Sequence, residues 1–384
     1  MQVLRDPRLH IIFGVTLSAV MGVSSITPAF PKIADALDIA PQQTGLLITF
    51  YYLSGVVLTP FLGFLSDRIG RKRILVPSLF LFGVAGFACS LVRDFESLLA
   101  LRFLQGMGAA SLGALNLTLI GDMFTGSERT AAMGYNASVL SVGTAAYPAV
   151  GGALALLGWH YPFVLPLVAI PVGLFVLFKL DNPEPDAAGD FKTYMRQVAI
   201  GLKDRRVLGI FAISFAVFAI LFGPYLTFFP LLLADKFAID SFAIGLVISS
   251  ASLSTFVVSA KLEALTRRFS ANGLIYASIA LYVVSMAAIP YMPSAGWLVL
   301  PSLIYGAAQG LNIPSVQTLL AGIAPAEYRG AFMALNGTVY RIGQTTGPVA
   351  AGLLFGVWGM QGVFWGAAVL AFMLVWVVLG SLRR

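Results

Sequence analysis

Two arginines, Arg102 and Arg341, stand out because each lies inside a long apolar stretch of a very hydrophobic chain. If these stretches cross a membrane, each arginine costs at least ~2.5 kcal/mol to insert, so each should face a cavity or a polar partner. Arg341 lies twelve residues after Arg329, which is roughly 18 Å along a helix and therefore near the midplane. We expect Arg341 to act in substrate binding or gating. For Arg102, a structural hydrogen-bonding role is an equal alternative.

Carboxylates, histidines and cysteines are placed where they cannot build a catalytic or metal centre inside these stretches. All seventeen Asp and Glu residues lie in predicted loops or at helix ends, and the chain has one cysteine, Cys89, and two histidines, His10 and His160. An intramembrane enzyme needs a buried acid, a histidine cluster or an activated nucleophile, and a glycine-rich ATP-binding loop is also missing. We therefore expect no enzymatic activity, no cofactor and no metal site.

The composition indicates that the solvent for most of this molecule is lipid. Of its 384 residues, 58% are hydrophobic and 11% are charged, whereas soluble proteins carry about 25% charged residues. This excludes a cytosolic enzyme, a nucleic-acid-binding protein and a secreted domain. A bilayer core needs roughly 20 apolar residues per helix. Twelve such spans are predicted, at about 9–31, 43–65, 74–92, 97–121, 130–156, 160–180, 207–234, 241–262, 272–292, 296–321, 330–356 and 361–381.

The distribution of positive charge predicts the orientation of this all-α membrane protein. An even number of spans puts both termini on one side. That side holds 19 of the 24 Lys and Arg residues, and the opposite loops hold only Lys32, Arg93 and Lys236. By the positive-inside rule, both termini are expected to be cytoplasmic. The chain is thus predicted to be a multi-pass protein of the inner membrane.

The chain divides into two related halves. Because 181–206 is the only long polar stretch, we expect six-helix bundles over 1–180 and 207–384, joined by a cytoplasmic linker. Residues 129–154 align without a gap to 329–354, with nine of 26 pairs identical, and Gln105-Gly106 resembles Gln309-Gly310 with a four-residue shift. Two such repeats, related by an axis normal to the membrane, predict a binding site between them and a rocking motion that opens it to either side.

A basic loop between the second and third spans is suited to lock helices together. Gly63 lets two helices approach closely, and Gly70 permits a tight turn. Asp67 can offer its charge to the positive amino-terminal end of a neighbouring helix. Arg71 can pair with Asp122 at the end of the fourth span. Topology control alone would explain the positive charge of this loop, but it does not require the glycine and aspartate spacing.

This loop resembles the signature loop of the major facilitator superfamily (MFS), G-x-L-x-D-R-x-G-R-K/R. Twelve spans in two halves extend the resemblance over essentially the whole chain. In that family the loop latches the halves together in the outward-open state, and the second-half counterpart here is degenerate. The resemblance implies that Asp67 faces the eleventh span near Gly330 and Ala331, and that the latch consists of Gly63, Asp67, Arg68, Gly70, Arg71 and Asp122.

Two further motifs resemble the 12-span drug:proton antiporter branch of the MFS. The fourth span carries Arg102, Gln105 and Gly106 in a segment similar to R-x-x-Q-G-x-G. The fifth span is similar to the antiporter motif G-x-x-x-G-P-x-x-G-G, although Tyr147 replaces one glycine. The residues of this antiporter-like motif are Gly143, Pro148, Gly151 and Gly152. Small residues permit close packing of membrane helices, and packing alone is the alternative explanation for them.

The resemblance also implies which side chains line a central cavity, because in this family spans one, four, seven and ten face the centre, with parts of two, five, eight and eleven. Unpaired amides are costly in lipid, which supports an inward orientation. Aromatic surface with scattered hydrogen-bonding groups suits a medium-sized amphipathic molecule. The candidate cavity residues are Met21, Ser25, Tyr52, Arg102, Gln105, Asn116, Asn136, Tyr225, Phe229, Gln309, Asn312, Asn336, Tyr340, Arg341 and Gln344.

These features predict a secondary active transporter that moves a small amphipathic molecule, drug-like or a metabolite, by alternating access as a proton-coupled exporter. Since no carboxylate lies mid-span, proton coupling would need Asp35, Asp122 or Asp235, or protonation linked to Arg102. The alternative is a metabolite, sugar, lipid or organic-anion carrier that uses Arg341 without proton coupling. We expect a monomer whose partners are a small-molecule substrate, membrane lipid and, in the exporter, protons, but no nucleic acid.

Overall fold

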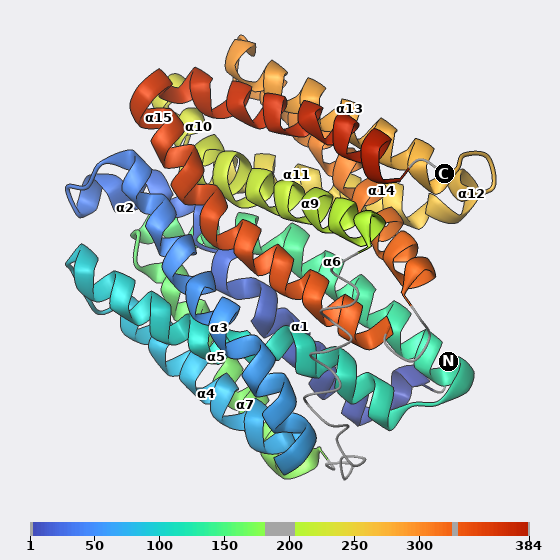
Figure 1. Cartoon of the computed structure of the whole chain (residues 1–384). Coiled ribbons are helices and arrows are strands. Elements are labelled where there is room, and N and C mark those ends of the chain that lie inside the picture. The colour runs from blue at the N-terminus through green and yellow to red at the C-terminus, as the bar shows by residue number, and fades with distance from the viewer. Residues whose placement is uncertain (1–2, 181–203, 325–328, 383–384) are drawn as a thin grey trace. The chain divides into compact units, whose positions relative to one another are not determined.

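The computed structural model describes residues 3–180, 204–324 and 329–382, apart from the side chains of Pro60, Gly63, Phe64, Asp67 and Ala331. All regular secondary structure in this part of the chain is helical (Figure 1). The α-helices are α1 (Pro7–Ser24), α2 (Phe30–Ala36), α3 (Leu46–Ile69), α4 (Arg71–Cys89), α5 (Phe95–Met123), α6 (Gly126–Leu157), α7 (Ala169–Lys179), α9 (Arg205–Ile220), α10 (Phe229–Phe237), α11 (Ser241–Ala260), α12 (Leu262–Thr266), α13 (Ala271–Ala288), α14 (Val299–Ile323) and α15 (Arg329–Ser381).

The described helices account for the twelve predicted spans. Nine helical segments are long and apolar enough to cross a membrane, by length and composition. The helices α3 and α14, with 24 and 25 residues, add two more. The 53-residue α15 contains two spans, because Gly359 interrupts it with φ 65° and ψ −162°, and the bend is visible in Figure 1. The prediction of an all-helical membrane protein with about twelve helices is confirmed.

Two spans are irregular at matching places. The first span leaves α-helical geometry after Ser24 and continues through a 3₁₀ turn (η2, Thr27–Ala29) into α2. The seventh span is α9 followed by a π-helical segment (η5, Leu221–Phe228) and α10. Pro28 and Pro224 lie in these irregular segments, and a proline cannot donate the hydrogen bond that continues a helix. Both breaks free backbone carbonyls inside an apolar bundle, where they need other donors.

Short polar side chains define where several helices begin. Asp94 precedes α5 and its Oδ1 accepts a hydrogen bond from the Ser97 backbone N–H at 2.8 Å, which is the usual action of an N-cap. This hydrogen bond lowers the pKa of the Asp94 carboxyl below its ordinary value. Gly70 separates α3 from α4 with φ 99°, a backbone conformation that side-chain-bearing residues rarely adopt. The tight turn predicted at Gly70 is therefore present.

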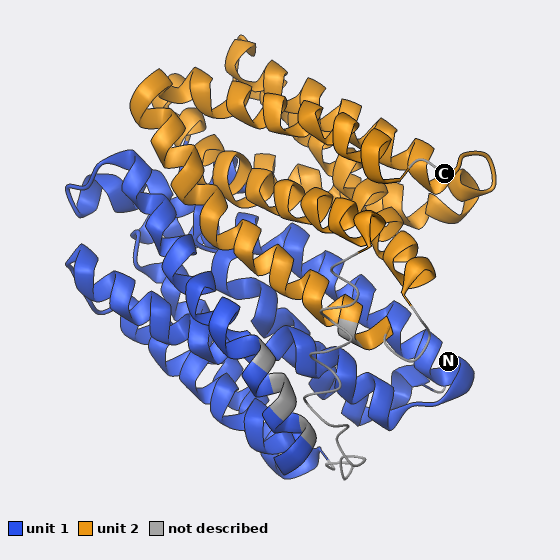
Figure 2. Cartoon of the chain, in the orientation of Figure 1, with its two compact units in different colours: residues 1–188, 240–245 blue, residues 189–239, 246–384 orange. Residues whose placement is uncertain are grey.

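The contacts group the chain into two compact units, which Figure 2 shows in two colours. Unit 1 comprises residues 1–188 and 240–245, and unit 2 comprises 189–239 and 246–384. In unit 1, α5 packs on α3 and α4, and α6 packs on α1. In unit 2, α14 packs on α13, and α15 packs on α9, η5 and α13.

The contacts in each unit show the register of the internal repeat. A Cβ on Gly106 would overlap the carbonyl oxygen of Tyr51, and one on Gly306 would overlap that of Ala251. Likewise, Thr59 donates to the Ala110 carbonyl oxygen at 3.0 Å, and Ser259 donates to the Gly310 carbonyl oxygen at 3.3 Å. These equivalent glycines and acceptors are 200 residues apart, the same offset as in the aligned fifth and eleventh spans. The resemblance of Gln105-Gly106 to Gln309-Gly310 correctly pairs the fourth span with the tenth, but these contacts give an offset of 200 without the four-residue shift.

Prediction for the close helix approach. Gly106→Ala should lower the free energy of unfolding by about 1–3 kcal/mol, since an added methyl group must push α5 away from the Tyr51 backbone. Gly113→Ala, on the same helix, is the matched control, because nothing lies within 4 Å of a Cβ at that position. Thermal unfolding of the purified variants in one detergent measures the difference. Equal destabilisation by both substitutions would show that the close approach at Gly106 is not required.

Candidate functional site

Arg102 is the centre of a buried polar cluster in unit 1. Its side chain is fully buried and extends from α5 to two other spans. Nε donates to the Leu47 carbonyl oxygen of α3 at 3.2 Å, and Nη1 donates to the Gly22 carbonyl oxygen of α1 at 2.9 Å and to Oε1 of Gln105 at 2.6 Å. The guanidinium also lies 4.4 Å from the ring centre of Tyr51. One side chain therefore joins three helices and supplies a donor to the Gly22 carbonyl close to the break in the first span.

Unit 2 has a different polar link at the equivalent level. Ser302, which is 200 residues after Arg102, donates to the Val247 carbonyl oxygen of α11 at 2.8 Å. The Tyr225 hydroxyl of η5 is hydrogen-bonded to the same serine. The Phe222 carbonyl oxygen, the counterpart of that of Gly22, accepts from Thr227 at 2.7 Å. Both units thus join three spans at this level, with a guanidinium in unit 1 and two hydroxyl groups in unit 2.

A second polar cluster in unit 1 contains two of the predicted amides. Asn116 of α5 donates to the Thr16 hydroxyl of α1, which donates to Oδ1 of Asn136 on α6 at 2.5 Å. All three side chains are buried. The sequence analysis identified the two asparagines and missed Thr16, because a single threonine in an apolar helix resembles an ordinary core residue.

In unit 2 the predicted polar and aromatic residues of η5 and α14 form a stacked cluster. The Tyr225 ring stacks on Tyr305 with ring centres 4.1 Å apart, and it also contacts Phe229. Nε2 of Gln309 donates to the Tyr305 hydroxyl at 2.8 Å. Asn312 donates to Ser278 of α13 at 2.9 Å. The rings of Tyr225 and Phe229 are buried inside unit 2, and the sequence analysis missed Tyr305 at the centre of the cluster.

The remaining candidates lie on α15, α1 and α3. Tyr340 stacks on Phe218 of α9 with ring centres 4.0 Å apart, and its hydroxyl lies within interaction range of Asn336, Ser214 and Gln317. Asn336 is buried, whereas Arg341 and Gln344 are half-buried. In unit 1, Met21 and Ser25 are buried and Tyr52 is half-buried.

The antiporter-like motif brings α6 into close backbone contact. A Cβ on Gly151 would overlap the Ser25 carbonyl oxygen of the first span, and one on Gly152 would overlap that of Ser241. Gly143 faces Leu17 of α1. Pro148 lies within α6. These contacts explain why Gly151 and Gly152 carry no side chain.

The predicted latch is partly within the described side chains. Nε of Arg71 lies 3.2 Å from Oδ2 of Asp122, and Nη1 of Arg71 is 3.3 Å from the Ser66 hydroxyl. This ion pair connects the beginning of α4 to the end of α5. Arg68 is exposed. The side chains of Gly63, Asp67 and Ala331 lie outside the described set, so the expected contact of Asp67 with the eleventh span does as well.

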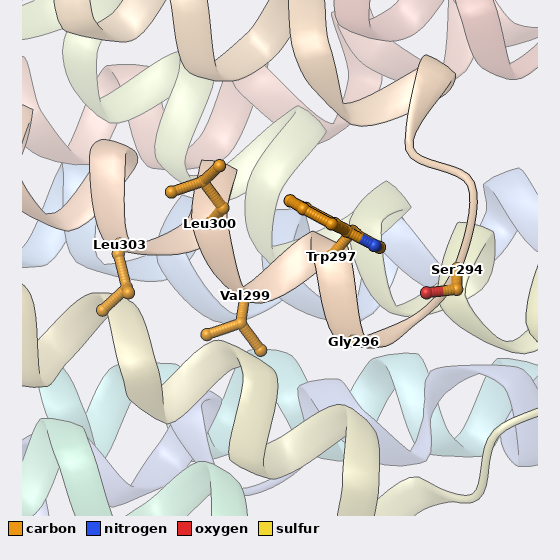
Figure 3. A pocket seen from close by; sticks show the side chains of 6 residues that line it. All are labelled: Ser294, Gly296, Trp297, Val299, Leu300 and Leu303. Carbon is orange, nitrogen blue, oxygen red and sulfur yellow. The ribbon is translucent and has the colours of Figure 1, made fainter.

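The surface hollow shown in Figure 3 is unrelated to the predicted cavity. It has a volume of about 380 Å³ and lies at the beginning of α14. Trp297 in its wall is 59% exposed and the adjoining Leu300 is 49% exposed. Its lining consists of Ser294, Gly296, Trp297, Val299, Leu300 and Leu303. An open apolar groove with one hydroxyl group suits contact with lipid better than recognition of a polar cargo.

Among the described residues, no group of three His, Cys, Asp or Glu side chains could hold a metal ion.

Two related helical bundles with buried polar clusters at equivalent levels define a multi-pass membrane transporter. The family model described as Major Facilitator Superfamily matches residues 12–344 and 292–384. The chain belongs to the Major Facilitator Superfamily, and it is a secondary transporter and not an enzyme.

Curated relatives of similar length are exporters and resistance proteins. The chain is 28% identical to the bacillibactin exporter of Bacillus subtilis (strain 168) over 350 residues, covering 87% of this chain and 86% of the relative. It is 28% identical to the class D tetracycline resistance protein of Salmonella ordonez over 354 residues, covering 89% and 86%. It is 25% identical to multidrug resistance protein 1 of Bacillus subtilis (strain 168) over 345 residues, covering 88% and 87%.

Solved structures share the fold. The nucleoside transporter NupG superposes with a TM-score of 0.82 at 14% identity, covering 99% of this chain and all of the other. An inward-facing, occupied bacterial homologue of the human lysosomal transporter Spinster superposes with a TM-score of 0.76 at 16% identity, covering 98% and 97%. At these identities the similarity establishes the fold alone.

Prediction for the Thr16 cluster. Thr16→Val should lower the free energy of unfolding by about 1–3 kcal/mol, because it removes the shared partner of two buried amides. The matched control is Thr118→Val, since Thr118 is exposed and bonds only within its own helix, to the Ala114 carbonyl oxygen. Thermal unfolding in detergent measures both variants. A Thr16→Val protein as stable as the control would show that the hydroxyl does not stabilise the bundle.

Proposed function

We propose that this transporter exports a small amphipathic molecule, drug-like or a metabolite, across the inner membrane, with both termini in the cytoplasm. The observation that carries the proposal is the set of buried amides, hydroxyls and aromatic rings on the spans that face the centre in this family, without a carboxylate among them. The exporters and resistance proteins among its relatives support export as the direction. Alternating access between the two bundles would expose these groups to each side in turn.

The charge of the candidate cavity limits the class of cargo. Arg102 and Arg341 are its ionisable groups apart from tyrosines, so a permanently cationic cargo would meet positive charge and no compensating carboxylate. Desolvating a cation beside another cation is unfavourable. Tyr225, Phe229 and Tyr340 offer aromatic faces, and Gln309 and Asn312 offer hydrogen-bonding groups. This combination favours neutral or anionic molecules with one apolar face.

Proton coupling in this scheme depends on groups at the helix ends. Asp35, Asp122 and Asp235 are exposed, and Asp122 is the one that is paired with a cation, Arg71. Protonation of Asp122 would remove the charge from that pair, and the end of α5 would then separate from the beginning of α4 more easily. In this way Asp122 would couple a proton to the latch. Protonation linked to Arg102 is the alternative route.

The test is transport by the full chain in proteoliposomes, with and without an imposed pH gradient. The panel contains cationic dyes, neutral drugs, organic anions and sugars. We expect gradient-dependent movement of neutral amphipathic drugs. Movement of anions or sugars only, indifferent to pH, would contradict the exporter proposal. That result would favour a carrier using Arg341, and Arg341→Gln should then abolish the movement, whereas Arg268→Gln, at an exposed position next to α12, should not.

Prediction for the latch. Asp122→Asn and Arg71→Gln should each slow transport about two- to fivefold, since a partly exposed ion pair contributes up to about 1 kcal/mol. The double exchange Arg71→Asp with Asp122→Arg should recover part of the rate, because it restores the attraction. Asp67→Asn should also slow transport without lowering expression. Transport rates in proteoliposomes at equal protein density measure these effects.

The control for the latch is Asp94→Asn, which removes a carboxylate from the opposite end of the same helix, where it caps α5. It should leave the transport rate unchanged. Unchanged rates in the Arg71, Asp122 and Asp67 variants would exclude the latch. Slowing by the Asp94 variant to the same degree would show that loss of any carboxylate on α5 is sufficient.

A further inference from the structure

The guanidinium of Arg102 is a buried positive charge, and its partners among the described residues include no carboxylate. Its contacts are the carbonyl oxygens of Gly22 and Leu47, the amide oxygen of Gln105, and the rings of Tyr51 and Phe163. All of these are neutral groups. A buried charge is expensive unless an opposite charge lies near it. The side chain is fully buried, so water at the surface cannot supply the missing compensation.

Two donor groups of this cluster have no acceptor among the described residues. They are Nη2 of Arg102 and Nε2 of Gln105. The orientation of the glutamine amide follows from the contact itself, because its oxygen must face the positively charged Nη1 at 2.6 Å. Nε2 consequently points away from the guanidinium and carries two hydrogens that need a partner. Both side chains are 0% exposed, so these donors need an acceptor that the described part of the chain does not provide.

The surroundings limit the size of that acceptor. A Cβ on Gly86 would lie 2.6 Å from Nε2 of Gln105 and 2.5 Å from Cβ of Pro166. Nε2 of Gln105 and the Pro166 ring therefore pack directly against the backbone of Gly86, and a side chain at this position would displace them. The ligand must therefore be small, negatively charged and able to accept several hydrogen bonds.

We propose that Arg102 and Gln105 form a binding site for a small monovalent anion, either a halide or the carboxylate group of a larger molecule. Nη2 of Arg102 and Nε2 of Gln105 would donate to the anion, and its charge would compensate the guanidinium. Charge-assisted hydrogen bonds of this kind are about twice as strong as neutral ones. The site belongs to unit 1 alone and does not depend on which cargo the transporter exports.

Unit 2 offers a matched comparison for this site. Gln309 is also buried on the corresponding span, but its unused atom is the oxygen Oε1, while its Nε2 donates to Tyr305. The position equivalent to Arg102 is Ser302, which is neutral. An unused acceptor beside neutral groups repels an anion. Gln309 therefore provides a control substitution of the same residue type in the same membrane environment.

The test uses heat unfolding of the full chain, in detergent and in lipid nanodiscs, at constant ionic strength. The solution holds the bulky anion gluconate, which is exchanged stepwise for chloride or for acetate. Cys89 is the single cysteine of the chain and is buried, so a thiol-reactive fluorophore reports its exposure on unfolding. We expect the unfolding temperature to rise with chloride, acetate or both, and to saturate, because ligand binding to the folded state stabilises it. A chloride response alone identifies a halide site, and an acetate response alone identifies a carboxylate site.

Two substitutions of Gln105 leave Arg102 in place. Gln105→Met removes the second donor and should raise the anion concentration of half-maximal effect about tenfold, as loss of one charge-assisted hydrogen bond predicts. Gln105→Glu supplies a carboxylate from the protein. It should raise the unfolding temperature in gluconate and abolish the response to added anion. Gln309→Met and Gln309→Glu should keep the wild-type anion response.

Several outcomes would overturn this proposal. An unfolding temperature that is independent of chloride and acetate would show that no anion binds. An equal rise in the wild type and in the Gln105→Glu variant would show a general salt effect at the surface. Since the measurement requires no transport, failure of the exporter proposal would leave these results unchanged, and failure here would leave the exporter proposal standing.

Discussion

Helix backbones inside each unit approach so closely at a few glycines that one added methyl group would not fit. Gly106 faces the Tyr51 carbonyl, Gly306 faces that of Ala251, and Gly151 faces that of Ser25. In an apolar solvent the hydrophobic effect does not drive helices together, so close packing and hydrogen bonding must do so. The glycine contacts fix the level at which each pair of helices meets. The polar clusters depend on this, because Arg102 can reach two neighbouring backbones only when they are this close.

The repeat conserves geometry and changes chemistry. Both units join the broken span to its neighbours at the same level, but Arg102 in unit 1 corresponds to Ser302 in unit 2, and Gln105 corresponds to Tyr305. Unit 1 is therefore charged at this level and unit 2 is aromatic. The same helix packing thus carries a guanidinium in one unit and stacked rings in the other.

The sequence predicts the number and position of the helices well because hydrophobicity over about twenty residues is a strong signal. It also predicts the pairing of Arg71 with Asp122, since helix ends at one membrane face bring few opposite charges together.

The sequence does not predict the register of the fourth and tenth spans correctly. There, matching Gln-Gly pairs suggested a four-residue shift, whereas the backbone contacts of Gly106 and Gly306 require the same offset as elsewhere. Residue identity is a poor guide in a chain made of few residue types. Thr16 and Tyr305 were missed for a related reason, because their hydrogen bonds depend on neighbours far away in the chain.

The two helix breaks place different demands on their surroundings. At the first break, the freed Gly22 carbonyl accepts its hydrogen bond from Arg102, a residue of another helix that also binds the α3 backbone. At the second break, the Phe222 carbonyl accepts from Thr227 of the same segment, and the link to α14 runs through the rotatable side chain of Tyr225. Bending the first span at this point would therefore break a charged tertiary hydrogen bond, whereas the Phe222 carbonyl of the seventh span keeps its donor within its own segment. Because an unsatisfied carbonyl is costly in an apolar bundle, the break in the first span depends on a residue of another helix, whereas the break in the seventh depends on its own segment.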